Sequence, residues 1–188
     1  RVQKAPLVLG HEVTGVVAKI VSAVKKFKAG ERVFVAHHVP CNACRYCLSG
    51  NHTVCQTLQS TNFYPGGFSE YIRVPAINIE RGTFILPENI SFEEGTFIEP
   101  LGCVLRGQRI SEIKEGQSVL ILGAGISGLL HLLLARRKKA GRIILTDVNE
   151  YRLKMAQELG ADFVINAQDD LVSVLRKENE GRLADQVI

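Results

Sequence analysis

The chain has 188 residues, of which 46% are hydrophobic and 22% are charged. These fractions are ordinary for one or two globular domains and argue against disorder. A formal net charge of +4 is too small to indicate a nucleic-acid-binding surface, and no apolar run reaches the roughly 20 residues of a membrane span. We therefore expect a cytoplasmic protein that binds neither nucleic acid nor membranes.

The first half of the chain has the pattern of an all-β domain. Short β-type runs are separated by glycine and proline, and they cover residues 13–20, 32–35, 68–74 and 83–86. Gly30 precedes the second run, and Gly66 and Gly67 precede the third, as turns between antiparallel strands require. We expect each run to form a strand.

Four of the five cysteines form a C-x2-C-x2-C-x7-C cluster within this half, namely Cys41, Cys44, Cys47 and Cys55. Thiolates two residues apart can converge on one ion, and four of them complete the closed tetrahedral shell of structural zinc. An iron–sulfur cluster is one alternative, although its fourth cysteine follows after three residues and precedes proline. Plain thiols are the other alternative. We predict a structural zinc site.

A helix is predicted to begin at Ser91, because Ser91 and Glu94 have the spacing of a capping box. Pro100 should interrupt or kink this helix, and the helical pattern resumes over residues 105–110. From Ser118 onward, strands and helices alternate. The expected strands are 118–122, 142–146, 163–165 and 186–188, and the expected helices are 127–139, 150–159 and 171–178. This order is typical of an α/β fold with a doubly wound parallel sheet.

A G-x-G-x-x-G sequence lies between the first strand of this sheet and its helix. Gly123 would allow the tight turn, Gly125 the close approach of a pyrophosphate, and Gly128 the close packing of helix on strand. The N–H groups at the helix start, where Ile126 lies, attract phosphate charge. The pattern alone is weak, but the strand before it and the apolar helix after it are the required context. We predict a dinucleotide site that includes these four residues.

Asp147 ends the second strand, about 20 residues after the glycines, where an acidic side chain typically binds the cofactor ribose. A carboxylate accepts hydrogen bonds from ribose hydroxyls and repels a 2′-phosphate, so NAD is favoured over NADP. Arg152 would flank the adenine or weaken that preference. A glycine-rich turn that binds no cofactor is the alternative.

Two short motifs that contain histidine or glutamate have no obvious metal-binding partner in the sequence. His11 and Glu12 follow Gly10 just ahead of the first strand, and Glu99 precedes Pro100. Spacing alone does not bring these motifs together, and each is also compatible with an ordinary surface polar residue. The other histidines (37, 38, 52 and 131) lack partners at metal-ligand spacing and are expected at the surface or in packing. Cys103 is expected to be a small buried apolar side chain.

In combination, these motifs resemble the zinc-dependent medium-chain dehydrogenases. The matching features, in order, are Gly-His-Glu at 10–12, the four-cysteine cluster, Ile-Glu-Pro-Leu at 98–101 and the glycine loop at 123–128. The Glu-Pro-Leu sequence resembles the sorbitol and threonine dehydrogenase branch. The resemblance implies a GroES-like catalytic domain over residues 1–110 and a Rossmann domain over residues 111–188, both incomplete.

The resemblance also implies an enzyme that transfers a hydride from an alcohol or polyol to NAD, as a homodimer or homotetramer. It implies a second, catalytic zinc on His11 and Glu99, with Glu12 as a neighbouring or alternate ligand. A cysteine ligand and a proton relay would precede Arg1, so we expect the chain to be a segment of a longer protein. The alternatives are a zinc-stabilised NAD-binding sensor or inactive family member, and a zinc-free quinone reductase.

Overall fold

The computed structural model describes residues 8–188 and divides by internal contacts into two compact units, Arg1–Glu99 and Pro100–Ile188. The first seven residues of the first predicted domain lie outside the described residues. The division falls near the start of helix α5 (Ile98–Ile110), whereas the boundary expected from the sequence, between residues 110 and 111, falls at the end of that helix. Of the helices between residues 8 and 188, none combines the length and the hydropathy that a membrane span requires.

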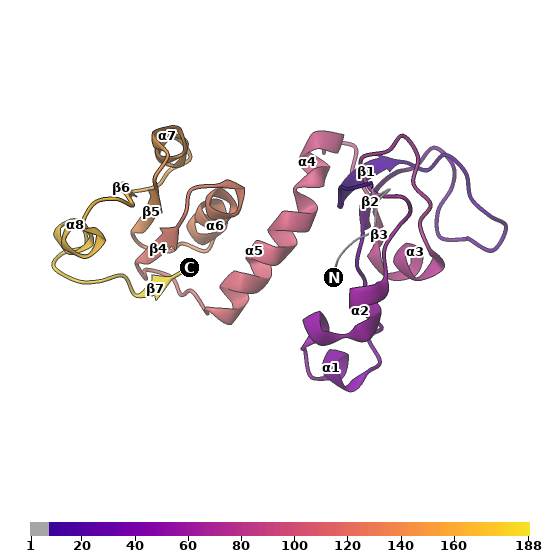
Figure 1. The fold of residues 1–188 in the computed structure, drawn as a ribbon, viewed down its shortest axis with the longest axis horizontal. Helices are drawn as coiled ribbons and strands as arrows, with labels where there is room; N and C mark the ends of the chain where they lie inside the picture. Colours follow the sequence, from indigo (N-terminus) through magenta and orange to yellow (C-terminus); the bar gives the residue numbers. More distant parts are fainter. Residues whose placement is uncertain (1–7) are drawn as a thin grey trace. The chain divides into compact units, whose positions relative to one another are not determined.

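The first unit is built on a three-stranded antiparallel sheet in the order β1-β2-β3. Its strands are β1 (Glu12–Val16), β2 (Arg32–Ala36) and β3 (Thr83–Ile85). Val33 and Val35 of the central strand face a core that also contains Phe27 and Phe63. Because side chains alternate along a strand, the valines of β2 supply one apolar face to this core. The remaining elements are α1 (Arg45–Leu48), η1 (His52–Val54), α2 (Gln56–Ser60), α3 (Ala76–Gly82) and α4 (Phe92–Thr96), of which the α-helices are labelled in Figure 1.

The prediction of a strand over residues 68–74 is wrong. In the described structure this segment consists of bends and irregular backbone, and its one β-type pairing is an isolated bridge between Tyr64 and Arg73. Its first backbone hydrogen bond runs from Phe68 N to Leu9 O, to a loop rather than to a strand of the sheet. Ile72 and Val74 still pack against the core. The alternating apolar residues of this segment therefore reflect the burial of their side chains and not a strand paired in a β-sheet.

The second unit is the predicted doubly wound parallel sheet. Its strands are β4 (Val119–Leu122), β5 (Ile143–Asp147), β6 (Phe163–Asn166) and β7 (Gln186–Val187). All pairings are parallel and the spatial order is β6-β5-β4-β7. The order reverses between β4 and β7, and ligands of such sheets bind at this switch point, beyond the carboxyl ends of the strands. The expected fold class is thus confirmed.

Helices cover both faces of this sheet (Figure 1). They are α6 (Ile126–Arg137), α7 (Glu150–Glu158) and α8 (Leu171–Glu178). Val119 and Ile121 of β4 belong to the core under α6 and α7, whereas Leu120 between them packs with Leu175 of α8. A strand buried on both faces has no polar alternation, which explains the continuous apolar run in β4.

The capping box predicted at Ser91 is present. Ser91 Oγ accepts a hydrogen bond from the Glu94 backbone N at 3.0 Å, and Glu94 Oε2 accepts one from the Ser91 backbone N at 2.8 Å. These bonds fix the start of α4. Phe97 separates α4 from α5, and Pro100 lies in the first turn of α5, where a missing N–H costs little. The break thus falls at Phe97, and α5 runs through Pro100 to Ile110 without interruption, so the prediction that Pro100 interrupts the helix is wrong.

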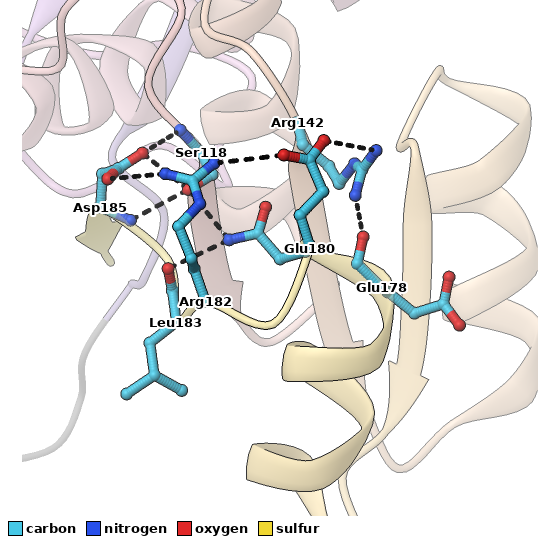
Figure 2. Close-up of polar contacts among 8 residues, drawn as sticks. Ser118, Arg142, Glu178, Glu180, Arg182, Leu183 and Asp185 are labelled. Carbon is cyan, nitrogen blue, oxygen red and sulfur yellow. Dashed lines mark hydrogen bonds and ion pairs between the residues drawn. The ribbon is translucent and has the colours of Figure 1, made fainter.

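A polar network around Ser118 holds the start of β7 beside β4 (Figure 2). Asp185 Oδ2 accepts hydrogen bonds from the backbone N and the Oγ of Ser118, both at 2.8 Å. Ser118 Oγ accepts in turn from Asp185 N at 3.0 Å and from Asn179 Nδ2 at 3.3 Å. Arg182 extends the network through ion pairs to Asp185 and Glu180. The network thus fixes the α8–β7 connection and, with it, the strand that completes the switch point.

Replacing Ser118 by alanine should lower the free energy of unfolding by about 2–3 kcal/mol. Ser118 is buried, and the substitution leaves Asp185 N and one donor of the buried Asn179 without their acceptor. Ser173→Ala is the matched control, because the hydroxyl of Ser173 bonds the exposed carboxylate of Asp170 just before α8, and its loss should change stability by about 0.5 kcal/mol or less. Urea unfolding of both variants measures the difference, and equal losses would contradict the network's role.

The loss in Ser118→Ala should also depend on pH. Hydrogen bonds from Ser118 hold the pKa of Asp185 below its ordinary value. A carboxyl group with a depressed folded-state pKa contributes stability above its unfolded pKa, and this is lost as the pH falls through the folded pKa. The difference between Ser118→Ala and wild type should therefore shrink below about pH 4. A difference that stays constant or grows on acidification would contradict this.

Candidate functional site

The four cysteines predicted to bind zinc converge around α1. Their sulfur atoms all lie within 4.8 Å of one another. The Sγ–Sγ distances are 3.9 Å between Cys41 and Cys47, 3.6 Å between Cys44 and Cys47, and 3.7 Å between Cys41 and Cys55. Tetrahedral zinc with Zn–S bonds of about 2.3 Å separates its sulfurs by about 3.8 Å. These distances fit one zinc ion and exceed the roughly 2 Å of a disulfide bond.

Backbone N–H groups prepare two of these sulfurs to be thiolates. Ala43 N and Cys44 N donate to Cys41 Sγ at 3.4 and 3.2 Å and lower the pKa of that thiol. Cys41 N donates to Cys55 Sγ at 3.4 Å, and this bond, with one from the Leu58 backbone, lowers the pKa of Cys55 to about 5. Burial raises the pKa of the Cys47 thiol to about 12. Cys47 therefore ionises only where a cation compensates its burial.

A second candidate metal site joins the two ends of the first unit. His11 directly precedes β1, Glu12 begins it, and Glu99 lies at the start of α5; their ligand atoms are within 4.8 Å of one another. His11 Nε2 and Glu99 Oε2 are 3.8 Å apart. Imidazole nitrogen and carboxylate oxygen are both zinc ligands, and a catalytic site needs three protein ligands and an open position. The donor set fits zinc, while the residues' role as ligands stays a prediction.

His37 lies directly beside this group, although the sequence gave no reason to single it out. Its ring centroid is 4.6 Å from that of His11, 3.9 Å from that of His38 and 6.4 Å from that of Phe63. Burial, followed by the neighbouring His38 and His11, lowers the pKa of His37 to about 4. His37 is therefore neutral at physiological pH and places an uncharged ring beside His11. His37 directly follows β2, and no pattern in the sequence indicates its contact with His11.

The glycine loop of the second unit lies between β4 and α6, at the switch point of the sheet. Gly123 has φ +101°, a conformation that favours glycine, and a Cβ on Gly128 would clash with the Gly123 carbonyl oxygen. These two glycines are required by the fold itself. A Cβ on Gly125, by contrast, would meet only Arg152 Nη1, at 3.9 Å.

The fold itself therefore does not require a glycine at position 125. A phosphate group that closely approaches the backbone at this position does require one. Gly125 is the N-cap of α6 and provides no side-chain cap for the helix. Its half-exposed neighbour Ile126 begins the helix, so the N–H groups of the first turn are oriented to bind an anion. The loop thus fits the pyrophosphate of a dinucleotide.

Asp147 lies at the carboxyl end of β5, next to this loop. Its Oδ2 accepts a hydrogen bond from Ala124 N and its Oδ1 one from Asn149 N, both at 2.9 Å. These two bonds, and then the nearby guanidinium of Arg152, lower the pKa of Asp147, so it is ionised at neutral pH. Arg152 Nη1 lies 3.6 Å from Asp147 Oδ2. The two predicted cofactor-binding side chains therefore form one pair beside Gly125.

Cys103 is exposed, so the prediction of a buried thiol is wrong. Helix α5 buries Pro100, Val104 and Gln108, which recur at a spacing of four residues. Cys103 lies one position before Val104 and is rotated about 100° away from this face.

Two family models match the chain. The model described as "Alcohol dehydrogenase GroES-like domain" matches residues 1–83, and the model described as "Zinc-binding dehydrogenase" matches residues 127–188. The "Probable D-xylulose reductase A" of Aspergillus clavatus is 40% identical over 194 residues, which cover 100% of this chain and 53% of the relative. The L-threonine 3-dehydrogenase of Deinococcus radiodurans is 37% identical over 175 residues, which cover 92% of this chain and 49% of the relative.

A solved structure of the alcohol dehydrogenase rspB from E. coli CFT073, complexed with NADH, has a TM-score of 0.83 and 31% identity; the match covers 97% of this chain and 53% of that one. Fold and site together define a two-domain protein with a metal-binding unit and a dinucleotide-binding unit. The chain belongs to the zinc-dependent medium-chain dehydrogenases. It spans about half the length of the curated relatives it matches.

Proposed function

We propose that the complete protein transfers a hydride from a secondary alcohol or polyol to NAD, with one catalytic and one structural zinc. The observation that carries this proposal is the convergence of His11, Glu12 and Glu99 from the two ends of the first unit. The names of the relatives, which include a xylulose reductase and a threonine dehydrogenase, support a hydroxylated substrate.

Each residue of the candidate site has a proposed role. His11 and Glu99 hold the catalytic zinc, and Glu12 is its neighbouring or alternate ligand. The His11 side chain is 52% exposed, so a substrate can reach this edge of the site, while Glu99 is 20% exposed and partly shielded from water. When bound, zinc stabilises negative charge on an alcohol oxygen, and NAD accepts the hydride. The neutral ring of His37 adds no positive charge beside the metal.

The cofactor role of the second unit depends on Asp147 and the glycine loop. An ionised Asp147 at the end of β5 accepts bonds from a ribose hydroxyl and disfavours a 2′-phosphate, which supports NAD over NADP. Arg152 neutralises part of this charge and forms the side of the site next to Gly125. We further propose that the complete protein is a cytoplasmic homodimer or homotetramer, which family membership supports.

Gly125→Ala should weaken NAD binding at least tenfold, or by about 1.4 kcal/mol, without loss of folding stability. The added Cβ has room within the protein but fills the space through which the pyrophosphate approaches. Gly102→Ala in α5 is the matched control, because nothing lies within 4 Å of its added Cβ. Calorimetric titration with NAD measures both variants. If Gly125→Ala bound NAD with wild-type affinity, the glycine loop would not be part of the cofactor site.

Turnover by the purified complete protein tests the proposed function. Sorbitol, xylitol, threonine, a vicinal diol and ethanol are offered with NAD or NADP, and formation of the reduced cofactor is followed by its absorbance. We expect turnover of at least one polyol, diol or hydroxy amino acid with NAD. A protein that binds NAD and zinc but oxidises none of these substrates would instead be a binding-only member of the family.

A further inference from the structure

The three proposed ligands of the catalytic metal come from two separate elements of the first unit. His11 directly precedes β1, Glu12 begins β1, and Glu99 belongs to the segment that continues from α4 into α5. Their distance from one another depends on how β1 is attached to that segment. The residue that makes the attachment therefore controls the geometry of the site, even if it does not bind the metal.

Thr14 makes that attachment through its hydroxyl. Thr14 Oγ1 donates a hydrogen bond of 2.9 Å to the carbonyl oxygen of Phe92, the first residue of α4, across a separation of 78 residues. The bond is partly buried, so water competes with it less than at the surface. The capping box of Ser91 and Glu94 fixes the same turn of α4.

The methyl group of Thr14 makes a second contact with the same helix. A Cβ on Gly95 would lie only 2.6 Å from Thr14 Cγ2, so the methyl group packs directly on the backbone of α4. Glu12 and Thr14 are two residues apart in β1 and point to the same face of the strand. The face that carries the proposed ligand Glu12 is thus the face that Thr14 holds against α4.

We propose that Thr14 is a positioning residue for the catalytic metal site, which it maintains by setting the distance from His11 and Glu12, at the beginning of β1, to Glu99 on α5. This inference rests on the proposed function, because it requires these three residues to bind metal. Groups that hold metal ligands in place typically contribute about 10–100-fold to metal affinity. Thr14 contributes through the hydroxyl bond, with its methyl group as the spacer.

Thr14→Val tests the hydroxyl, because valine keeps the shape and the methyl contact but cannot donate to Phe92. In the complete protein, zinc affinity is measured by competition with a chromophoric chelator, and the metal site is monitored by the visible absorption of substituted cobalt(II). We expect Thr14→Val to weaken zinc at the catalytic site at least tenfold and to change the cobalt spectrum. Thr14→Ser, which keeps the hydroxyl, should restore most of the affinity.

Two controls separate positioning from general stability. Thr96→Val removes a hydroxyl bond of 2.7 Å that stays within α4, and it should leave zinc affinity unchanged. The four-cysteine site in the same samples should keep its zinc and its resistance to proteolysis. Wild-type zinc affinity in Thr14→Val, equal loss of both metal sites, or an equal effect of Thr96→Val would each overturn the proposal. Glu99→Ala separates a failure of the proposed function from a failure of this inference. If Glu99→Ala leaves the catalytic metal in place, the proposed function fails. If Glu99→Ala loses that metal but Thr14→Val does not weaken it, only the inference about Thr14 is overturned.

Discussion

Cys55→Ser is expected to abolish zinc binding at the four-cysteine site and to unfold residues 41–60. The elements of this segment bury almost nothing else: Cys47 is the buried residue of α1, and neither η1 nor α2 contributes one. Cys55 itself is 1% exposed. Structural zinc supplies about 10–16 kcal/mol in small zinc-dependent domains. A segment with so small a core of its own therefore depends on the metal.

Zinc content and limited proteolysis measure this effect. Cleavage between residues 41 and 60 should become fast in Cys55→Ser, and chelation of the wild type should reproduce it. Cys103→Ser is the matched control, because that cysteine lies outside the cluster. A Cys55→Ser variant that kept its zinc and its resistance to protease would show that this segment folds without metal.

Glu99→Ala is expected to lower kcat/KM of the complete protein about a thousandfold, which corresponds to about 4 kcal/mol. Glu99 is the proposed ligand that comes from outside β1, and its carboxylate lies 3.8 Å from the His11 imidazole. Without it, the proposed ligands within this chain are two adjacent residues of one segment, His11 and Glu12, which cannot surround an ion. Loss of catalytic zinc should accompany the loss of activity.

Steady-state kinetics with the best substrate, together with zinc analysis, measures the effect. Glu93→Ala is the matched control, since Glu93 is an exposed carboxylate of α4 that lies outside the metal-ligand group. Full activity and full zinc content in Glu99→Ala would exclude Glu99 as a ligand. That result would also overturn the proposed catalytic metal site, because His11 and Glu12 alone cannot surround an ion.

The second unit was predictable from the sequence because its signals are local. Its strands are apolar on both faces, and Gly123 and Gly160 punctuate the ends of elements, so every helix and strand lies within one or two residues of its expected position. The cysteine cluster was predictable for the same reason, since three of its four ligands lie within seven residues.

Features of the first unit that depend on distant contacts were not predictable in this way. Residues 68–74 have the alternation of a strand, but the backbone of Phe68 bonds to the loop at Leu9. The grouping of His11 with Glu99 followed from a family resemblance and not from spacing. His37 and Thr14 carried no signal in the sequence, because their contacts with His11 and Phe92 exist only after the chain folds.

The most direct test of the account is a metal count on the complete protein and on its His11→Ala variant. We predict two zinc ions per chain in the wild type and one in His11→Ala, with the remaining zinc held by the four cysteines and NAD binding retained. A wild-type protein that holds a single zinc ion, kept in full by His11→Ala, would contradict the assignment of His11, Glu12 and Glu99 as a catalytic metal site.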